Sequence, residues 1–337
     1  MEIDSPSVSL APEAARPRPR IHWRNIALLG GSLGAYIALF VFLLRDPGVV
    51  NGLQDKLAAT FGELWKLLRE EFFLNPWFYG VIAAVLLLER LIPADPKQGV
   101  LSQGARQDLV WIPFKLLFQA SFIPAVIVLL RLGFDRYLGF LTIDAVTAWP
   151  APARIALAVL WGDFLFWLIH YIRHKVLFLW YFHAVHHSQK ELNFFTEYRV
   201  HPLDDVFAIT FGVIPILMVE HSFVTVAAIV WIRHWHTRIC HSNLRTNFGP
   251  LKYILVTPQS HRVHHSVDEK HHDTNFGLTF SIWDHLFGTQ HREYDIYPET
   301  GINDLDFPFE QDRSAFASLN TLLRQLIYPF QAVSRRP

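Results

Sequence analysis

Three short histidine clusters carry the residues of this chain that are best suited to bind a metal. They read HYIRH at 170–174, HAVHH at 183–187 and HRVHH at 261–265. Residues three or four positions apart lie on one face of an α-helix, so each cluster directs its imidazoles to one side. A neutral imidazole is the commonest metal ligand in proteins. The clusters supply eight candidate ligands: His170, His174, His183, His186, His187, His261, His264 and His265.

A fourth cluster, HWHTRICH at 234–241, offers His236 and His241 as further ligands. One tetrahedral zinc ion takes four ligands, whereas these clusters offer eight to ten, so the pattern predicts two metal ions. Imidazole ligation suits iron, zinc, copper or nickel and does not choose among them. The sequence does not decide whether His201 and His272 are ligands or residues that support ligands.

Three polar side chains are candidates for holding the ligands in place. Asp163 stands inside an apolar segment, seven residues before His170, and therefore on the same helix face. Metal-bound histidines commonly donate their second N–H to a carboxylate or a carbonyl group. We expect Asp163 to accept such a hydrogen bond, and we expect Asn275 and Asp284 to support the site in the same way.

The composition excludes several other classes of protein. The chain has 337 residues, a formal net charge of +0 and 51% hydrophobic residues. A neutral chain has no bulk field that would attract nucleic acid. Its one cysteine, Cys240, excludes a disulfide framework and a cysteine-rich metal site. The chemistry is therefore expected from histidines set in a strongly apolar chain.

Four apolar runs predict membrane-spanning helices, at 26–44, 78–93, 109–132 and 155–174. Arginines in the Pro- and Arg-rich tail before the first run place the N-terminus in the cytoplasm. Pro113 and Pro124 allow kinks in the third run, or a re-entrant shape. The charged stretch 52–72 has apolar residues at helical spacing and predicts an amphipathic helix on the membrane surface, with an ordinary packed helix as the alternative.

The apolar stretch 204–233 predicts a helical hairpin, with a turn marked by Pro215, Glu220, His221 and Ser222. A hairpin emerges on the side from which it entered, whereas a single span would divide the clusters between the two sides of the membrane. The prediction is an all-α integral membrane protein with about four transmembrane helices plus the hydrophobic hairpin. A histidine-rich cap then faces the cytoplasm.

The order of these motifs resembles the fatty acid hydroxylase / sterol desaturase superfamily. HxxxH, HxxHH and a second HxxHH follow one another, with a hydrophobic hairpin before the last. Similar neighbouring stretches are DFLFWLIHYIRH, EYRVHPLD, the HSN after Cys240, HRVHHSVDEKHHDTNFG and WDHLFGT. The resemblance covers roughly residues 155–300. It implies transmembrane helices beneath a cytosolic dimetal centre, with the eight histidines named first as ligands and His241, ranked above His236, completing the set.

The resemblance also implies a function. Members are membrane-bound non-haem di-iron enzymes that use O₂ to hydroxylate or desaturate lipids such as sterols and fatty acyl chains. The expected position of the histidines, where membrane helices meet the cytoplasm, supports this function, because a substrate there would be a lipid. Breaking an aliphatic C–H bond of a lipid needs an oxidant such as iron-activated O₂. The sequence shows no cytochrome b5-like module and no flavin or nicotinamide fingerprint, so we expect a separate reductase, ferredoxin or cytochrome b5-like electron donor.

We divide the chain into four parts and keep two other functions open. The parts are a disordered tail (1–24), membrane helices with the surface helix (25–150), a di-iron domain (151–300) and a C-terminal tail or cap (301–337). A metal-binding membrane transporter would place ionisable residues along a path across the bilayer. A zinc-dependent membrane hydrolase would need an open coordination position at the metal.

Overall fold

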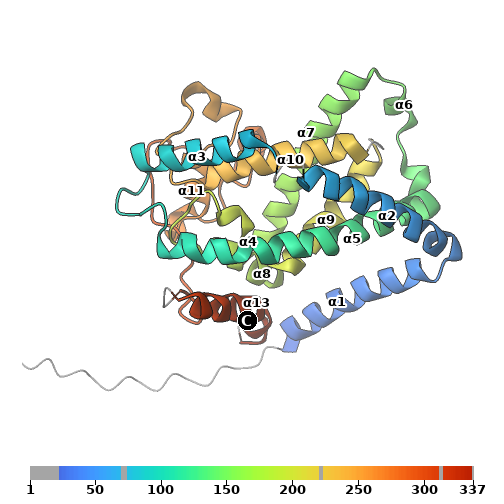
Figure 1. Ribbon diagram of the computed structural model, residues 1–337, viewed down its shortest axis with the longest axis horizontal. Helices are drawn as coiled ribbons and strands as arrows, with labels where there is room; N and C mark the ends of the chain where they lie inside the picture. Colours follow the sequence, from blue (N-terminus) through green and yellow to red (C-terminus); the bar gives the residue numbers. More distant parts are fainter. Residues whose placement is uncertain (1–22, 70–73, 220–222, 311–313, 336–337) are drawn as a thin grey trace, which may run out of the picture.

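The computed structural model describes residues 23–69, 74–219, 223–310 and 314–335, and these form helices without a β-strand (Figure 1). Three stretches are long and apolar enough to cross a membrane: α1 (Trp23–Leu44), the succession Gln103–Leu141 and α7 (Ala151–Lys175). Only 6% of the most apolar window of α1 is buried inside the protein. Such exposure is expected of a helix that faces lipid, so the described helices support the predicted membrane protein.

The second predicted span is short for crossing a membrane. The run at 78–93 forms α3 (Pro76–Leu91), which Asn75 caps and which has 16 residues. About 20 residues are needed to span a bilayer core, so the described helices that meet this length number three rather than four. The third run is broken in two, into α4 (Gln103–Ser121) and α5 (Ile123–Gly133). Pro124 opens α5 because proline is tolerated in the first turn of a helix, while Pro113 remains inside α4.

The predicted amphipathic helix is α2 (Pro47–Leu68), which begins at the capping carboxylate of Asp46. It packs along α5, where Gly52 lies against the side chain of Leu132. Leu43, Val49 and Leu129 form a small buried cluster where α1, α2 and α5 meet. The helix itself is therefore observed, with one side packed on its neighbours. Its position on a membrane surface remains a prediction.

The predicted hairpin consists of α9 (Pro202–Leu217) and α10 (Phe223–His241). Pro215 lies inside α9, and the other predicted turn residues, Glu220, His221 and Ser222, lie outside the described residues. The first turn of α9 and the last turn of α10 both reach the histidines, since Asp204 contacts His183 and His241 contacts His186. The stretch therefore leaves the site and returns to it, as the hairpin requires.

The remaining helices surround this arrangement. The histidine clusters lie on α7, on α8 (Leu177–His187) and on α11 (Pro258–His264). In the C-terminal part, α13 (Ala315–Arg335) packs against α4 and α8 and lies beside the start of α1 (Figure 1). The short connecting helices are η2 (Phe134–Leu138), η3 (Gly139–Leu141), α6 (Asp144–Thr147), η4 (Thr196–Tyr198), η5 (Gly249–Tyr253), η6 (Glu269–His271) and α12 (Ile282–Phe287). The tail predicted for 1–24 falls almost entirely outside the described residues.

Candidate metal centre

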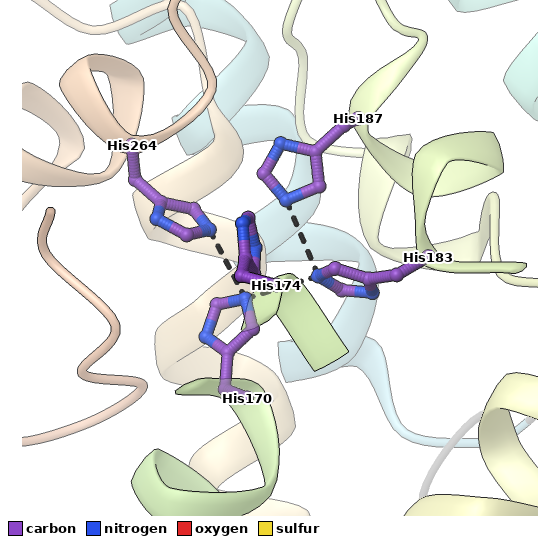
Figure 2. Close-up of side chains that lie close together, drawn as sticks. All are labelled: His170, His174, His183, His187 and His264. Atoms are coloured by element: carbon purple, nitrogen blue, oxygen red, sulfur yellow. Dashed lines mark hydrogen bonds between the residues drawn. The ribbon is translucent and has the colours of Figure 1, made fainter. Parts of the chain in front are cut away.

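Nine histidines converge in two adjacent groups in the described part of the chain. The first group is His170, His174, His183, His187 and His264, and the second is His186, His241, His261 and His265. Within each group the candidate ligand nitrogens all lie within 4.8 Å of one another. Figure 2 shows the five rings of the first group pointing toward one another from α7, α8 and α11. The rings of His187 and His265 stack with centroids 4.1 Å apart, so the two groups share a boundary.

The hydrogen bonds of the first group leave ring nitrogens without protons. The Nδ1 atom of His170 donates to the carbonyl oxygen of Phe276 at 2.8 Å, and that of His264 donates to the carbonyl oxygen of Thr274 at 2.8 Å. The Nδ1 atom of His183 donates to the carboxylate of Asp204 at 3.0 Å. A neutral imidazole has one N–H, so the Nε2 atom of each of these rings carries only a lone pair.

These lone pairs face one another. The Nε2 atom of His170 lies 3.0 Å from Nε2 of His183 and 3.0 Å from Nε2 of His264, along two of the dashed lines of Figure 2. With no proton between them, such nitrogens repel unless a cation lies among them. Ligand nitrogens about 2.1 Å from one ion and at right angles are about 3.0 Å apart. The separations therefore fit a shared metal ion.

The second group repeats this pattern. His241 donates from Nδ1 to the carbonyl oxygen of Thr237 at 2.7 Å, and His186 donates to that of Arg199 at 3.3 Å. Their Nε2 atoms face each other at 3.0 Å, and Nε2 of His261 lies 2.9 Å from Nε2 of His241. His265 is fully buried, and neither of its ring nitrogens has a hydrogen-bond partner. Buried polar atoms are rarely left unpaired, so this ring also fits a metal ligand.

Burial keeps these imidazoles neutral. It lowers the pKa of His264 to about 4, and it lowers the pKa of His186, His187, His261 and His265 well below the ordinary value. Loss of water disfavours the charged form of a histidine. The rings therefore offer lone pairs rather than positive charge at neutral pH, as metal binding requires.

Two carboxylates support the ligands, and sequence reasoning missed both. The buried carboxylate of Asp204 accepts from Nδ1 of His183 and, at 2.9 Å, from Arg173. Glu197 contacts Nδ1 of His234 at 2.8 Å and lies 3.4 Å from Nδ1 of His241. Both residues belong to the stretch EYRVHPLD, in which the sequence analysis considered His201 but neither acidic residue.

The residues predicted to support the ligands hold a loop rather than the imidazoles. Asp163 accepts hydrogen bonds from the backbone N–H groups of Thr279 and Phe280 and from the indole of Trp283, and none of these donors is a histidine. The structure therefore places the Asp163 carboxylate against the 279–283 segment and not against a ligand. Seven residues of spacing place Asp163 on the same face as His170, but about 10 Å farther along the helix, where it meets the 279–283 segment.

The loop held in this way supplies the carbonyl groups that orient two ligands. Asp284 accepts from the backbone N–H groups of Phe276 and Gly277 at 2.9 and 2.7 Å. Asn275 donates to the carbonyl oxygen of Ser260 and accepts from the backbone N–H of His291. A Cβ atom at Gly277 would lie 2.7 Å from the Phe280 carbonyl oxygen, so only glycine allows this approach. Asn275 and Asp284 thus position the segment whose carbonyls receive the N–H groups of His170 and His264.

Other candidate histidines lie outside the two groups. His236 contacts the carbonyl oxygen of Val256 through Nε2 at 3.0 Å, so the geometry places His241 in the centre and His236 beside it. His201 caps α9, because its Nδ1 accepts from the backbone N–H of Leu203. His272 is exposed on its loop. His234 contacts Glu197 and supports the centre indirectly.

A cavity of about 590 Å³ reaches the histidines from the apolar interior. Its walls include two histidines of the first group and three of the second: His170, His183, His186, His241 and His261. Away from the histidines the walls come mainly from apolar side chains of α5 and α9. Its volume is in the range of small-molecule binding sites, so both groups of histidines face one cavity of ligand size.

Comparison with known proteins agrees with this site. Residues 155–289 match the fatty acid hydroxylase family. Ornithine lipid hydroxylase OlsE of Rhizobium tropici is 34% identical over 143 residues, 42% of this chain and 43% of that protein. Alkylglycerol monooxygenase of Xenopus tropicalis is 32% identical over 147 residues, 42% of this chain and 31% of that protein. A putative Delta(7)-sterol-C5(6)-desaturase of Arabidopsis thaliana is 24% identical over 200 residues, 58% of this chain and 68% of that protein.

These matches confirm the resemblance to the fatty acid hydroxylase / sterol desaturase superfamily, and the family match contains all nine converging histidines. The aligned segment spans less than half the length of the first two relatives. No solved structure matches the chain.

Proposed function

We propose that this chain is a membrane-bound, O₂-dependent oxidoreductase that hydroxylates or desaturates a C–H bond of a lipid at a non-haem di-iron centre. The observation that carries the proposal is the convergence of nine imidazoles, eight of them buried, whose ring nitrogens face one another beside a mainly apolar cavity. Its relatives are named for hydroxylation, monooxygenation and desaturation of lipids.

The two groups of histidines would hold one iron ion each. Iron would supply the activation of O₂ that cleavage of an aliphatic C–H bond requires. Asp204 and the carbonyl groups of Thr274 and Phe276 fix the tautomers and ring orientations of His183, His264 and His170. Five imidazoles in the first group exceed the four ligands of a tetrahedral zinc site, so the ligand set favours iron chemistry over a zinc hydrolase.

The lipid would enter from the bilayer, and the electrons would come from another protein. The cavity wall formed by α5 and α9 is apolar and excludes water from the reacting chain. A reductase, a ferredoxin or a cytochrome b5-like protein is the proposed electron donor. The centre faces the cytoplasm in this proposal: the arginines before the first apolar run place the N-terminus there, and α3 is taken as a short fourth crossing beside α1, the succession Gln103–Leu141 and α7. The hairpin's return to the site keeps all the histidines on that side.

Labelled O₂ tests the proposal. The iron-loaded protein, given a chemical reductant and lipids extracted from its host, should produce a lipid that is hydroxylated with one labelled oxygen atom or that has gained a double bond. His265→Ala should abolish this product, whereas His285→Ala, at an exposed position outside both groups, should retain it. Product formation without O₂, or without iron, would refute the proposal.

A further inference from the structure

Three arginines line the cavity at the end where the histidines lie: Arg173, Arg233 and Arg238. Each has buried guanidinium N–H donors without a hydrogen-bond partner, namely Nε of Arg173, Nε of Arg233, and both Nε and Nη1 of Arg238. Leaving a buried donor unpaired costs free energy, and the cost is larger for a charged group. The polar end of the cavity therefore has hydrogen-bond donors that the described protein does not satisfy.

The charges at this end are also unbalanced. Arg173 pairs with Asp204, and Glu197, which contacts the rings of His234 and His241, adds a second negative charge, so three arginines face two carboxylates. Within the described residues, no carboxylate oxygen forms an ion pair with Arg233 or Arg238. Buried arginines are normally paired. The neutral imidazole ligands add no negative charge, so this end of the cavity attracts anions.

Aromatic rings hold the guanidinium groups of Arg233 and Arg238 in place, and Nη2 of Arg233 also lies 3.3 Å from Nε2 of His234. Arg233 lies over the ring of Phe166, with its Cζ atom 4.1 Å from the ring centroid. Arg238 lies 5.0 Å from the centroid of Tyr198 and 5.3 Å from that of Trp235, and only 7% of its surface is exposed. A guanidinium group fixed by stacking loses little further freedom when it binds an oxyanion, and its forked donors match carboxylate and phosphate oxygens.

The rest of the cavity has the shape of a site for an apolar chain. One face of α9 lines it from Asp204 to Leu217, through residues 204, 205, 208, 209, 212, 213, 216 and 217. These fourteen residues of helix extend about 20 Å. Ile123, Ile127 and Val128 of α5 lie on the same wall. A cavity with a charged end and an extended apolar channel is complementary to an amphiphilic ligand.

We propose that Arg233 and Arg238 bind the anionic oxygen head group of the lipid substrate, a carboxylate or a phosphate, while its chain occupies the channel between α5 and α9. The proposal rests on the function proposed above and adds a substrate class to it. The head group then lies beside the histidines and not at the far end of the channel. Neutral lipids such as alcohols lack the oxyanion that this site recognises.

Equilibrium binding of three matched probes tests the head-group site. The metal-free chain in detergent is titrated with hexadecanoate, hexadecyl phosphate and hexadecan-1-ol, which share one chain length. We expect both anions to bind about tenfold to a hundredfold more tightly than the alcohol, because charged hydrogen bonds differ from neutral ones by about that factor. The tighter of the two anions distinguishes a carboxylate head from a phosphate head.

Variants then assign the preference to the arginines. Arg233→Gln and Arg238→Gln should each lower the affinity for the anions by about tenfold and leave that for the alcohol unchanged. Arg233→Lys should restore part of the loss, because it retains the charge without the fork. Arg292→Gln, at an exposed arginine outside the cavity, is the matched control and should bind as the wild type does.

Equal affinity of the wild-type chain for all three probes would overturn the proposal, and this comparison needs no variant to fold. An anion preference that survives in the double variant Arg233→Gln/Arg238→Gln would also overturn it. The measurement uses neither metal nor O₂, so it is independent of turnover. A preference for anions without O₂-dependent turnover would refute the oxygenase and leave the head-group site intact.

Discussion

Replacing Asp204 with asparagine removes one negative charge from the support of the first histidine group and changes little else in shape. The carboxylate accepts from Nδ1 of His183 at 3.0 Å and from Arg173 at 2.9 Å, and only 3% of the residue's surface is exposed. An asparagine oxygen can still accept a hydrogen bond, but it does not balance the charge of Arg173 or raise the basicity of the His183 ring.

The expected effect on metal binding follows from these contacts. Loss of a partner that orients a metal-bound histidine typically weakens metal affinity about 10- to 100-fold, or about 1.4 to 2.8 kcal/mol. Arg173 would also lose the anionic partner of a buried ion pair, a change that costs up to about 3–5 kcal/mol of folding stability. The asparagine hydrogen bond that remains should keep Asp204→Asn at the lower end of that range.

The assay is competition for ferrous iron between the protein and a chelator of known affinity, read as iron per chain. Asp205→Asn is the matched control, because Asp205 is the next residue of the same helix and lines the same cavity, but it pairs with Lys115 and not with a histidine. Thermal unfolding of both metal-free variants measures the loss of stability separately from the loss of metal.

The result that would refute the reasoning is an equal loss of iron in Asp204→Asn and Asp205→Asn, or no loss in either. An equal loss would mean that the cavity's charge, and not the hydrogen bond to His183, controls metal binding. A loss confined to Asp204→Asn would support the role of this carboxylate.

Four further outcomes are expected. His241→Ala should lose about one iron ion per chain by elemental analysis, whereas His236→Ala should retain both, because only His241 lies in a histidine group. His265→Ala should lose iron, and thermal unfolding of the metal-free variant should show only the loss of packing of this buried ring, since its nitrogens make no hydrogen bond that could be lost. Asp163→Asn should bind two ions but show faster amide hydrogen exchange at 279–283, the segment held by that carboxylate. Acid should destabilise the metal-free chain, because the pKa of His264 is about 4 in the folded chain and about 6.5 in the unfolded chain. The thermal unfolding temperature should be highest above about pH 6.5 and should fall as the pH drops toward 4.

The spacing of the histidines was the most informative feature of the sequence. HxxxH and HxxHH place ligands on one helix face wherever the helix lies, so the eight histidines of those motifs could be predicted without knowing the fold. All eight lie in the two groups. The ranking of His241 above His236 agrees with the geometry, because the last turn of α10 directs His241 toward His186.

The supporting residues could not be predicted in the same way. Helical spacing predicted that Asp163 would contact a histidine. The spacing gives the direction of the side chain but not its distance along the helix axis, and Asp163 lies far enough from His170 to contact the 279–283 segment instead. Asp204 and Glu197 reach the ligands only because α9 starts at α8 and η4 lies beside α10. Such contacts depend on the packing of helices far apart in sequence.

The membrane topology was predicted only in outline. The apolar runs correctly predicted helices, but α3 is 16 residues long, and α4 and α5 divide a run that hydropathy presented as one. The register that directs Arg233 and Arg238 into the cavity depends on how α10 packs on its neighbours, which a single sequence does not reveal.

The iron content of the purified chain tests the central claim most directly. After anaerobic loading with ferrous iron and removal of the excess, elemental analysis should find two iron ions per chain, because the nine imidazoles form two groups. One ion per chain, or none, would contradict a dinuclear centre built from these histidines.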